Sequence, residues 1–147
     1  MPVCLHPDRE PAQVFRLAAL HHELFSSAEA LRELQVVLSR PKFDAWQPLG
    51  QRLAWLKLYQ SAVAMIEPKE KVTDCRDSKD NKFLDLALAA NAAVIVSSDV
   101  RLLELHPFRG IEIVGLRELK AGYLGCYKAR RDPCACFARL DAFAAFG

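Results

Sequence analysis

One helix and the strand that follows it limit what this chain can fold into. Residues 79–90 carry apolar side chains at helical spacing, and Asn91 ends the pattern. Residues 93–96 are a short apolar run without a polar face, which is typical of a strand buried on both faces. Such strands lie in parallel sheets covered by helices on both sides. The stretch therefore predicts an α/β domain.

The rest of the chain continues the alternation of helices and strands. Helices are expected at residues 11–22, 27–40, 47–61, 79–90, 100–105 and 116–120, and strands at 3–5, 62–66, 93–96 and 111–114. Ser26-Ser27-Ala28-Glu29 has the pattern of a capping box at a helix start. The alternation implies right-handed crossovers and a three-layer α/β/α fold around a mainly parallel sheet, with the first strand shortened or absent.

Two groups of side chains in the first half of the chain have a predicted location, either on a polar helix face or in the core. Gln51, Arg52 and Lys57 are expected on the polar side of the helix at 47–61, opposite its leucines. Trp46 and Trp55 are favoured as core residues over the alternative that they stack on nucleic-acid bases.

The overall numbers exclude several classes of protein. With 147 residues the chain fits one domain, expected at 1–120, with an extension at 121–147. No apolar run approaches the ~20 residues needed to cross a bilayer, so no membrane association is expected. The first residues lack the pattern of a secretory signal, which favours a cytoplasmic location. A net charge of +2 does not by itself indicate nucleic-acid binding.

The extension raises two alternatives. Its basic residues could form an arm for RNA or a partner, or the segment could be a packed appendix; these residues are Lys128, Arg130, Arg131 and Arg139. Three of the five cysteines also lie there, but their spacing is a poor match to structural zinc sites, so free thiols are expected.

Several spaced motifs resemble one known family, the PIN domain. They are Arg40–Phe43, Asp77–Leu84, Ala87–Ala90, Val96–Asp99 and Leu105–Ile111. More narrowly, they are similar to the PIN proteins that act as toxins of bacterial toxin–antitoxin pairs. The resemblance implies a Mg²⁺- or Mn²⁺-dependent ribonuclease with an acidic cluster on a parallel sheet. It also implies a single-stranded RNA substrate and a small antitoxin protein as partner.

The resemblance assigns the metal ligands Glu33, Asp80 and Asp99, which would also be the catalytic residues. The residues that would orient these ligands without binding the metal directly are Ser97, Ser98, Asn81 and Asp77. Each acid also has an ordinary interpretation. Asp77 or Asp80 could stabilise a helix start, Asp99 could cap the helix at 100–105, and Glu33 and Asp85 could lie on solvated faces.

The start of the chain departs from the family pattern. His6 stands where the family has the aspartate of its first strand, and Asp8 stands where it has an asparagine. Asp8 could serve as a replacement ligand, or His6 could, although magnesium prefers oxygen. The loss of one carboxylate predicts weakened or absent activity.

A second function class therefore stands beside the nuclease, namely an inactive PIN-like module for binding or dimerisation. A phosphoacceptor receiver is disfavoured because no paired acidic motif follows the first strand. A serine or cysteine hydrolase is disfavoured because no glycine-flanked nucleophile occurs. A short first strand would leave exposed strand edges, so we expect a homodimer.

Overall fold

The computed structural model describes residues 10–124 and 136–137, and the side chains of residues 13–122. The helices are α1 (Glu10–His21), α2 (Ala28–Leu38), α3 (Leu49–Ala62), α4 (Asn81–Ala89), α5 (Val100–Leu103) and α6 (Leu116–Leu119). A 3₁₀ turn covers Pro41–Phe43 and a π-helical turn covers Lys120–Leu124. The strands are β1 (Leu24–Ser26), β2 (Val63–Met65), β3 (Val94–Val96), β4 (Glu112–Val114) and β5 (Cys136–Phe137).

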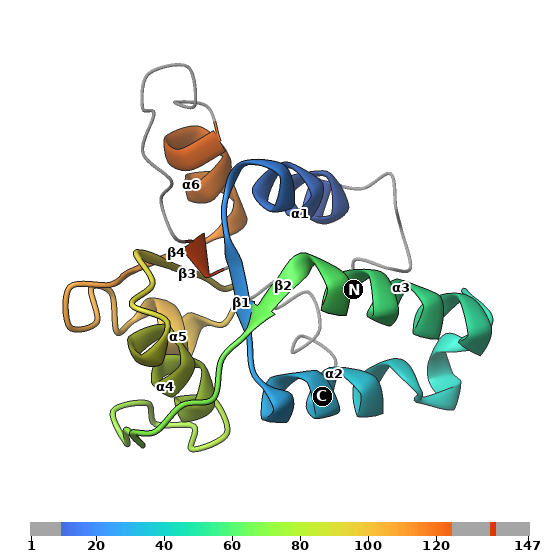
Figure 1. Ribbon diagram of the computed structural model, residues 1–147, viewed down its shortest axis with the longest axis horizontal. Helices are drawn as coiled ribbons and strands as arrows, with labels where there is room; N and C mark the ends of the chain where they lie inside the picture. Colours follow the sequence, from blue (N-terminus) through green and yellow to red (C-terminus); the bar gives the residue numbers. More distant parts are fainter. Residues whose placement is uncertain (1–9, 125–135, 138–147) are drawn as a thin grey trace.

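Every strand pair in the described part of the chain is parallel. β1 pairs with β2, while β3 lies between β4 and β5 in a second sheet. Helices α1 and α6 lie on one side of the strands and α4 and α5 on the other (Figure 1). The α/β class is thus confirmed. Because the strands form two hydrogen-bonded groups among these residues, one continuous sheet in a three-layer fold stays a prediction.

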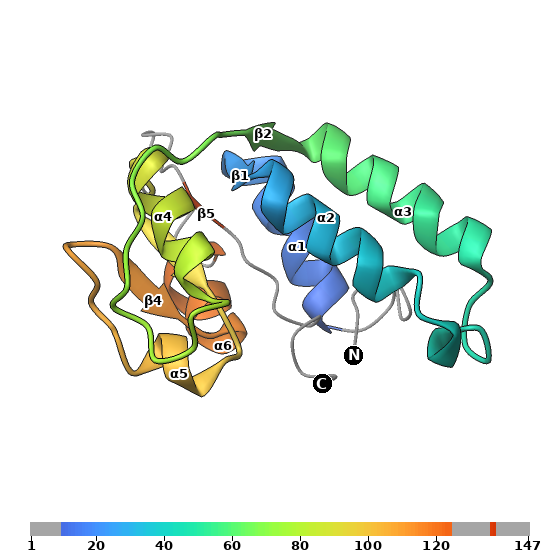
Figure 2. The same cartoon turned by 90° about the horizontal axis from the view of Figure 1, so that it is seen from below.

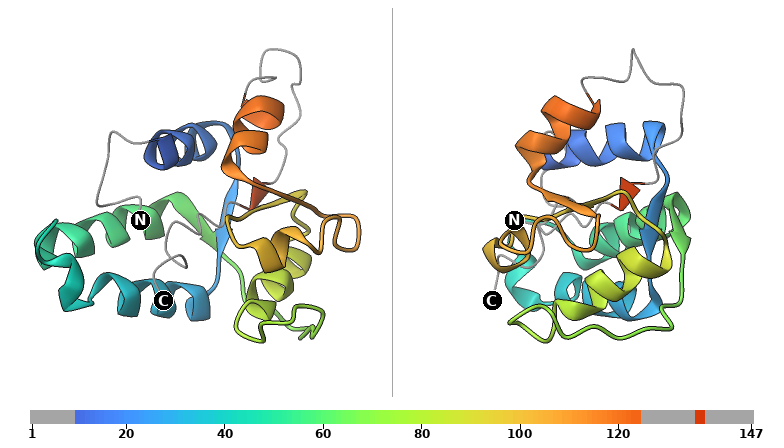
Figure 3. Two further views of the ribbon diagram at one scale, coloured as in Figure 1. Left: turned by 180° about the vertical axis from the view of Figure 1, so that it is seen from behind. Right: turned by 90° about the vertical axis from the view of Figure 1, so that its left-hand side faces the viewer.

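The strand β5 comes from the extension beyond residue 120. It pairs with β3, opposite β4, and also contacts β1, so it lies between the two groups of strands (Figure 3). The expected first strand at 3–5 lies outside the described residues. The extension therefore contributes at least one strand to the domain, paired with β3 and in contact with β1.

The expected helices and inner strands are found within a few residues of their predicted bounds. Ser27 caps α2, and its hydroxyl oxygen accepts from the Ala30 amide at 3.2 Å. The strand β1 was not predicted, because three residues between two helices are too few to show a period of two. No helix in the described ranges combines the length and apolar character that crossing a membrane requires.

Helices α2 and α3 lie side by side and antiparallel (Figure 2), and a buried arginine joins them. The Arg52 guanidinium donates to the carbonyl oxygens of Leu38 at 2.5 Å and Arg40 at 3.1 Å, and forms an ion pair with Asp44. Its side chain is fully buried, so the prediction that Arg52 lies on the polar face of α3 is wrong. The Leu38 carbonyl at the end of α2 has no amide donor from the helix, and Arg52 supplies one, whereas the Arg40 carbonyl also accepts from the Phe43 amide at 3.1 Å.

The aromatic residues of α3 pack toward α1. Trp55 and Tyr59 stack with ring centroids 5.5 Å apart, and Phe15 of α1 lies 6.0 Å and 5.7 Å from them. Trp55 therefore packs against the core as predicted. Trp46 differs, because it follows the 3₁₀ turn and remains 53% exposed.

The main core forms around α4 and β3. Leu84, Leu86 and Ala87 of α4 and Ile95 of β3 have no exposed surface, and Phe83 is 7% exposed. This packing holds α4 and β3 in one hydrophobic cluster. Of the acidic residues assigned from the sequence, Asp80 directly precedes α4 and Asp99 lies shortly after β3, whereas Glu33 lies in α2.

Candidate acidic site

The first turn of α4 places Asp80 inside the protein. Asp80 is the N-cap residue and is only 6% exposed, but its side chain makes no capping hydrogen bond to the helix. Asp77 does not cap α4 either, because its carboxylate accepts from the Lys79 amide at 3.1 Å and pairs with Arg101 at 2.5 Å. The interpretation of Asp77 as the helix cap is thus wrong, and Asp77 stabilises the turn before the helix.

Asp99 lies at the carboxyl end of β3. Its carboxylate accepts from the Arg101 amide at 2.9 Å and caps α5, as the ordinary interpretation predicted. Its backbone amide donates to the hydroxyl oxygen of buried Ser97 at 3.0 Å, while Ser98 is exposed. Ser97 therefore helps to fix the backbone from which the Asp99 carboxylate projects.

The surroundings of the Cys75 thiol raise its pKa. Burial is the main cause that raises the pKa of this thiol, and a hydrogen bond from the Asp77 backbone partly opposes it. The negative charges of Asp80, Asp77 and Asp99 raise the pKa further. Arg101 links two of these acids directly, because its amide donates to the Asp99 carboxylate and its guanidinium pairs with Asp77. Asp80 belongs to the same turn as Asp77, since its amide donates to the Asp77 carbonyl at 3.0 Å.

The third assigned ligand, Glu33 of α2, is already paired with a cation. Its carboxylate forms an ion pair with the Lys82 ammonium of α4. The Lys82 side chain is only 14% exposed, whereas that of Glu33 is 45% exposed. The ion pair joins α2 to the start of α4, so Glu33 is neither free nor on a purely solvated face.

Asn81 and Asp85 hold the segment before α4 in place. Asn81 accepts from the Cys75 amide at 2.8 Å and donates to the Cys75 carbonyl at 3.4 Å. Asp85 accepts from the Val72 amide at 2.6 Å and is 8% exposed, so the prediction of a solvated Asp85 is wrong. Their spacing of four places both on the buried side of α4, a signal that sequence reasoning missed.

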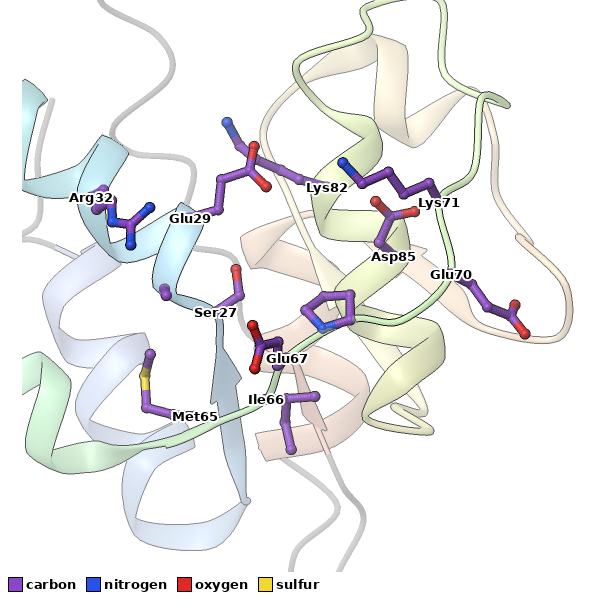
Figure 4. A pocket seen from close by; sticks show the side chains of 12 residues that line it. Ser27, Glu29, Arg32, Met65, Ile66, Glu67, Glu70, Lys71, Lys82 and Asp85 are labelled. Carbon is purple, nitrogen blue, oxygen red and sulfur yellow. The ribbon is translucent and has the colours of Figure 1, made fainter.

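A hollow of about 420 Å³ lies beside this site, between the start of α2, the loop after β2 and α4 (Figure 4). Its charged lining is mixed, and Lys82 belongs both to the hollow and to the ion pair with Glu33. The sequence did not reveal the hollow, because its lining comes from three segments with no common motif.

The described residues offer few side chains that could bind a metal ion together. In the described residues, no group of three or more His, Cys, Asp or Glu side chains is arranged to hold a metal ion. Mg²⁺, however, usually keeps several waters and binds through one or two carboxylates together with substrate phosphates. Of the acids assigned from the sequence, Asp80 and Asp99 are the two from which such a site would be built, while Asp77 and Glu33 form ion pairs with Arg101 and Lys82. Asp99 also accepts from the Arg101 amide.

Other predicted site residues lie outside the described part of the chain. These are His6 and Asp8 at the start and Lys128, Arg130 and Arg131 in the extension. Among the described cysteine side chains, Cys75 is a free, buried thiol.

Comparison with known families agrees with the resemblance seen in the motifs. Residues 1–101, more than two thirds of the chain, match the PIN domain. Curated proteins and solved structures gave no match. PIN domains are generally nucleases and typically use a divalent metal ion. The chain belongs to the PIN domain family.

Proposed function

We propose that this protein is a metal-dependent endoribonuclease of PIN type that cleaves single-stranded RNA as the toxin of a toxin–antitoxin pair. The observation that supports the proposal is a contact between two acidic segments in a chain of a nuclease family. The turn that holds Asp77 and Asp80 meets the start of α5, which Asp99 caps, through the ion pair between Asp77 and Arg101. Ligands of open parallel sheets bind at the carboxyl ends of the strands, and Asp99 follows β3 at that end.

Asp80 and Asp99 would hold Mg²⁺ or Mn²⁺, with Glu33 as a further ligand once it leaves Lys82. A bound metal ion supplies an activated water and neutralises charge on the phosphoryl group. Ser97 keeps the Asp99 backbone in place, and Asn81 and Asp85 keep the Asp80 turn in place. Asp8 stays a proposed additional ligand.

One observation favours the second candidate, an inactive binding or dimerisation module. Lys82 forms an ion pair with Glu33, and Arg101 forms one with Asp77. Part of the acidic charge is therefore neutralised within the protein. Neutralised carboxylates attract a divalent ion less strongly. The module would keep the antitoxin and the second copy as partners without cleavage.

The deciding experiment compares cleavage of a fluorescent single-stranded RNA in Mg²⁺ and Mn²⁺ by the full chain and its variants. Asp80→Asn and Asp99→Asn are expected to lose at least about 100-fold in rate, because each removes a direct metal ligand. Glu104→Gln removes an exposed acid elsewhere and should match the parent protein. Equal, negligible cleavage by all four proteins would leave only the binding module.

Association with a second copy is a separate proposal. In the described part of the chain, β2 and β4 each have one edge without a partner strand, and such edges invite pairing. A homodimer, the antitoxin partner and the cytoplasmic location stay predictions. Sedimentation at several concentrations tests the dimer, and a monomer at high concentration would contradict it.

A further inference from the structure

The hollow beside the acidic site is large enough for one nucleotide unit. Its volume of about 420 Å³ lies within the roughly 300–1,000 Å³ of sites that hold small ligands. It opens where β1 and β2 end, next to the Ser27 cap of α2. Because Lys82 lines it and also pairs with Glu33, its occupant would lie near Glu33, one of the three acids assigned to the metal.

The charges of the lining disfavour a bare phosphate. Basic side chains come from Arg32, Lys71 and Lys82, but four acidic residues accompany them. Of these acids, Asp85 is already bonded to the Val72 amide, whereas Glu67 is exposed at the loop. A lining that offers both donors and acceptors suits a neutral group with both kinds of polar atom, such as a nucleobase.

The hollow also has apolar surface against which a flat ring can pack. Met65, Ile66 and Pro68 contribute it from the end of β2 and the loop that follows. Bases removed from a stack are held in this manner, by apolar side chains on their faces and hydrogen bonds at their edges. Unpaired bases of single-stranded RNA expose those edges, so they are available for sequence-specific recognition.

Two charged residues stand on opposite sides of the hollow. Figure 4 shows Arg32 on the α2 side and Glu67 on the side of the loop after β2. Arginine pairs with the adjacent acceptors O6 and N7, which only guanine presents. Guanine also carries N–H donors on its pairing edge, which a carboxylate such as that of Glu67 can accept. The other three bases match only part of this arrangement.

We propose that the hollow is a guanine-binding subsite, in which Arg32 and Glu67 select a guanine next to the phosphodiester that is cleaved. The inference rests on the proposed function for its substrate class, single-stranded RNA. It adds the base that the protein selects and the residues that select it.

The test measures binding without cleavage. Fluorescence anisotropy in EDTA is recorded with 2′-O-methyl oligonucleotides of seven uridines, in which the central base is changed to guanine, adenine or cytosine. The guanine oligonucleotide is expected to bind about tenfold more tightly than the others. Arg32→Gln and Glu67→Gln should each abolish this preference, and both residues are exposed, so the variants should fold.

Arg117→Gln and Glu104→Gln are the matched controls, since they make the same changes at exposed positions that do not line the hollow. They should keep the full preference for guanine. Equal binding of all four oligonucleotides, or a preference that survives in Arg32→Gln and Glu67→Gln, would overturn the inference. If cleavage occurs without a preference for guanine, the subsite is wrong and the nuclease stands. If the preference for guanine occurs without cleavage, the subsite stands and the nuclease is wrong.

Discussion

Lys82 of α4 forms an ion pair with Glu33 of α2, the residue that the family resemblance assigns to the metal. The stem of Lys82 is largely buried, and its ammonium lies 5.2 Å from the centre of the Phe83 ring. The cation is thus held in place by the helix that also carries Asp80. A divalent ion that uses Glu33 must compete with a resident ammonium.

This competition predicts that Lys82→Met binds metal more tightly than the parent protein. Removing the ammonium frees Glu33 and leaves the site more negative, so the affinity for Mn²⁺ should rise about two- to fivefold. The electron paramagnetic resonance signal of free Mn²⁺ measures this without RNA. Lys79→Met removes an exposed lysine nearby and should change the affinity less. Unchanged or weaker binding in Lys82→Met would show that Glu33 has no part in the metal site.

The ion pair also shows what the sequence could reveal. Glu33, Asp80 and Asp99 were found by resemblance, because motifs keep their spacing along the chain. Their partners were not found, since Lys82 meets Glu33 only after α2 packs against α4. Periodicity predicts which helices and strands form, but a contact between two charged side chains depends on how those elements pack.

The prediction that Arg52 lies on a polar helix face is wrong for a related reason. Its charge indicates an exposed face, but the Leu38 carbonyl at the end of α2 has no amide donor from the helix, and the Arg52 guanidinium donates to it. Similarly, Asp85 was expected in solvent although its neighbours Leu84 and Leu86 are fully buried. In both cases an unpaired backbone group determined the place of a charged side chain, and composition gives no sign of such a group.

Replacing Arg52 should destabilise the protein strongly. Arg52→Met would remove the guanidinium donor to the Leu38 carbonyl, while the Arg40 carbonyl would keep the Phe43 amide as a donor. It is expected to lower the free energy of unfolding by about 1–3 kcal/mol. Asp44→Asn should lower it by less than about 1 kcal/mol, because the Asp44 side chain is 61% exposed. Urea denaturation measures both changes. A loss in Asp44→Asn as large as that in Arg52→Met would mean that the ion pair itself dominates.

The bond from Val72 to Asp85 predicts a difference between two substitutions at one position. Asp85→Ala removes the acceptor from a buried amide and should lower the free energy of unfolding by about 1–3 kcal/mol. Asp85→Asn keeps an acceptor oxygen and should cost less than about 1 kcal/mol. Urea denaturation of the two variants distinguishes these outcomes. Equal losses would indicate that the charge, not the hydrogen bond, is what the site requires.

The pKa of Cys75 allows the arrangement of the acidic site to be tested without activity. Burial raises this pKa above its ordinary value of 9.0, and the charges of Asp80, Asp77 and Asp99 raise it further. A raised pKa means that the folded protein retains the proton longer than the unfolded chain. The thiol therefore contributes stability below about pH 9, and that contribution is lost as the pH rises through the folded-state pKa.

Neutralising either ligand candidate should consequently lower the pKa of Cys75. Asp80→Asn and Asp99→Asn each remove a negative charge near the thiol, so titration of the Cys75 ¹³Cβ chemical shift should have its midpoint at lower pH than in the parent protein. Glu33→Gln is the control, because the Glu33 charge is not among the causes that raise this pKa. A shift in Asp80→Asn alone would place Asp99 away from the site. Because the proposed nuclease needs both carboxylates at one metal site, the joint shift is the outcome that it requires.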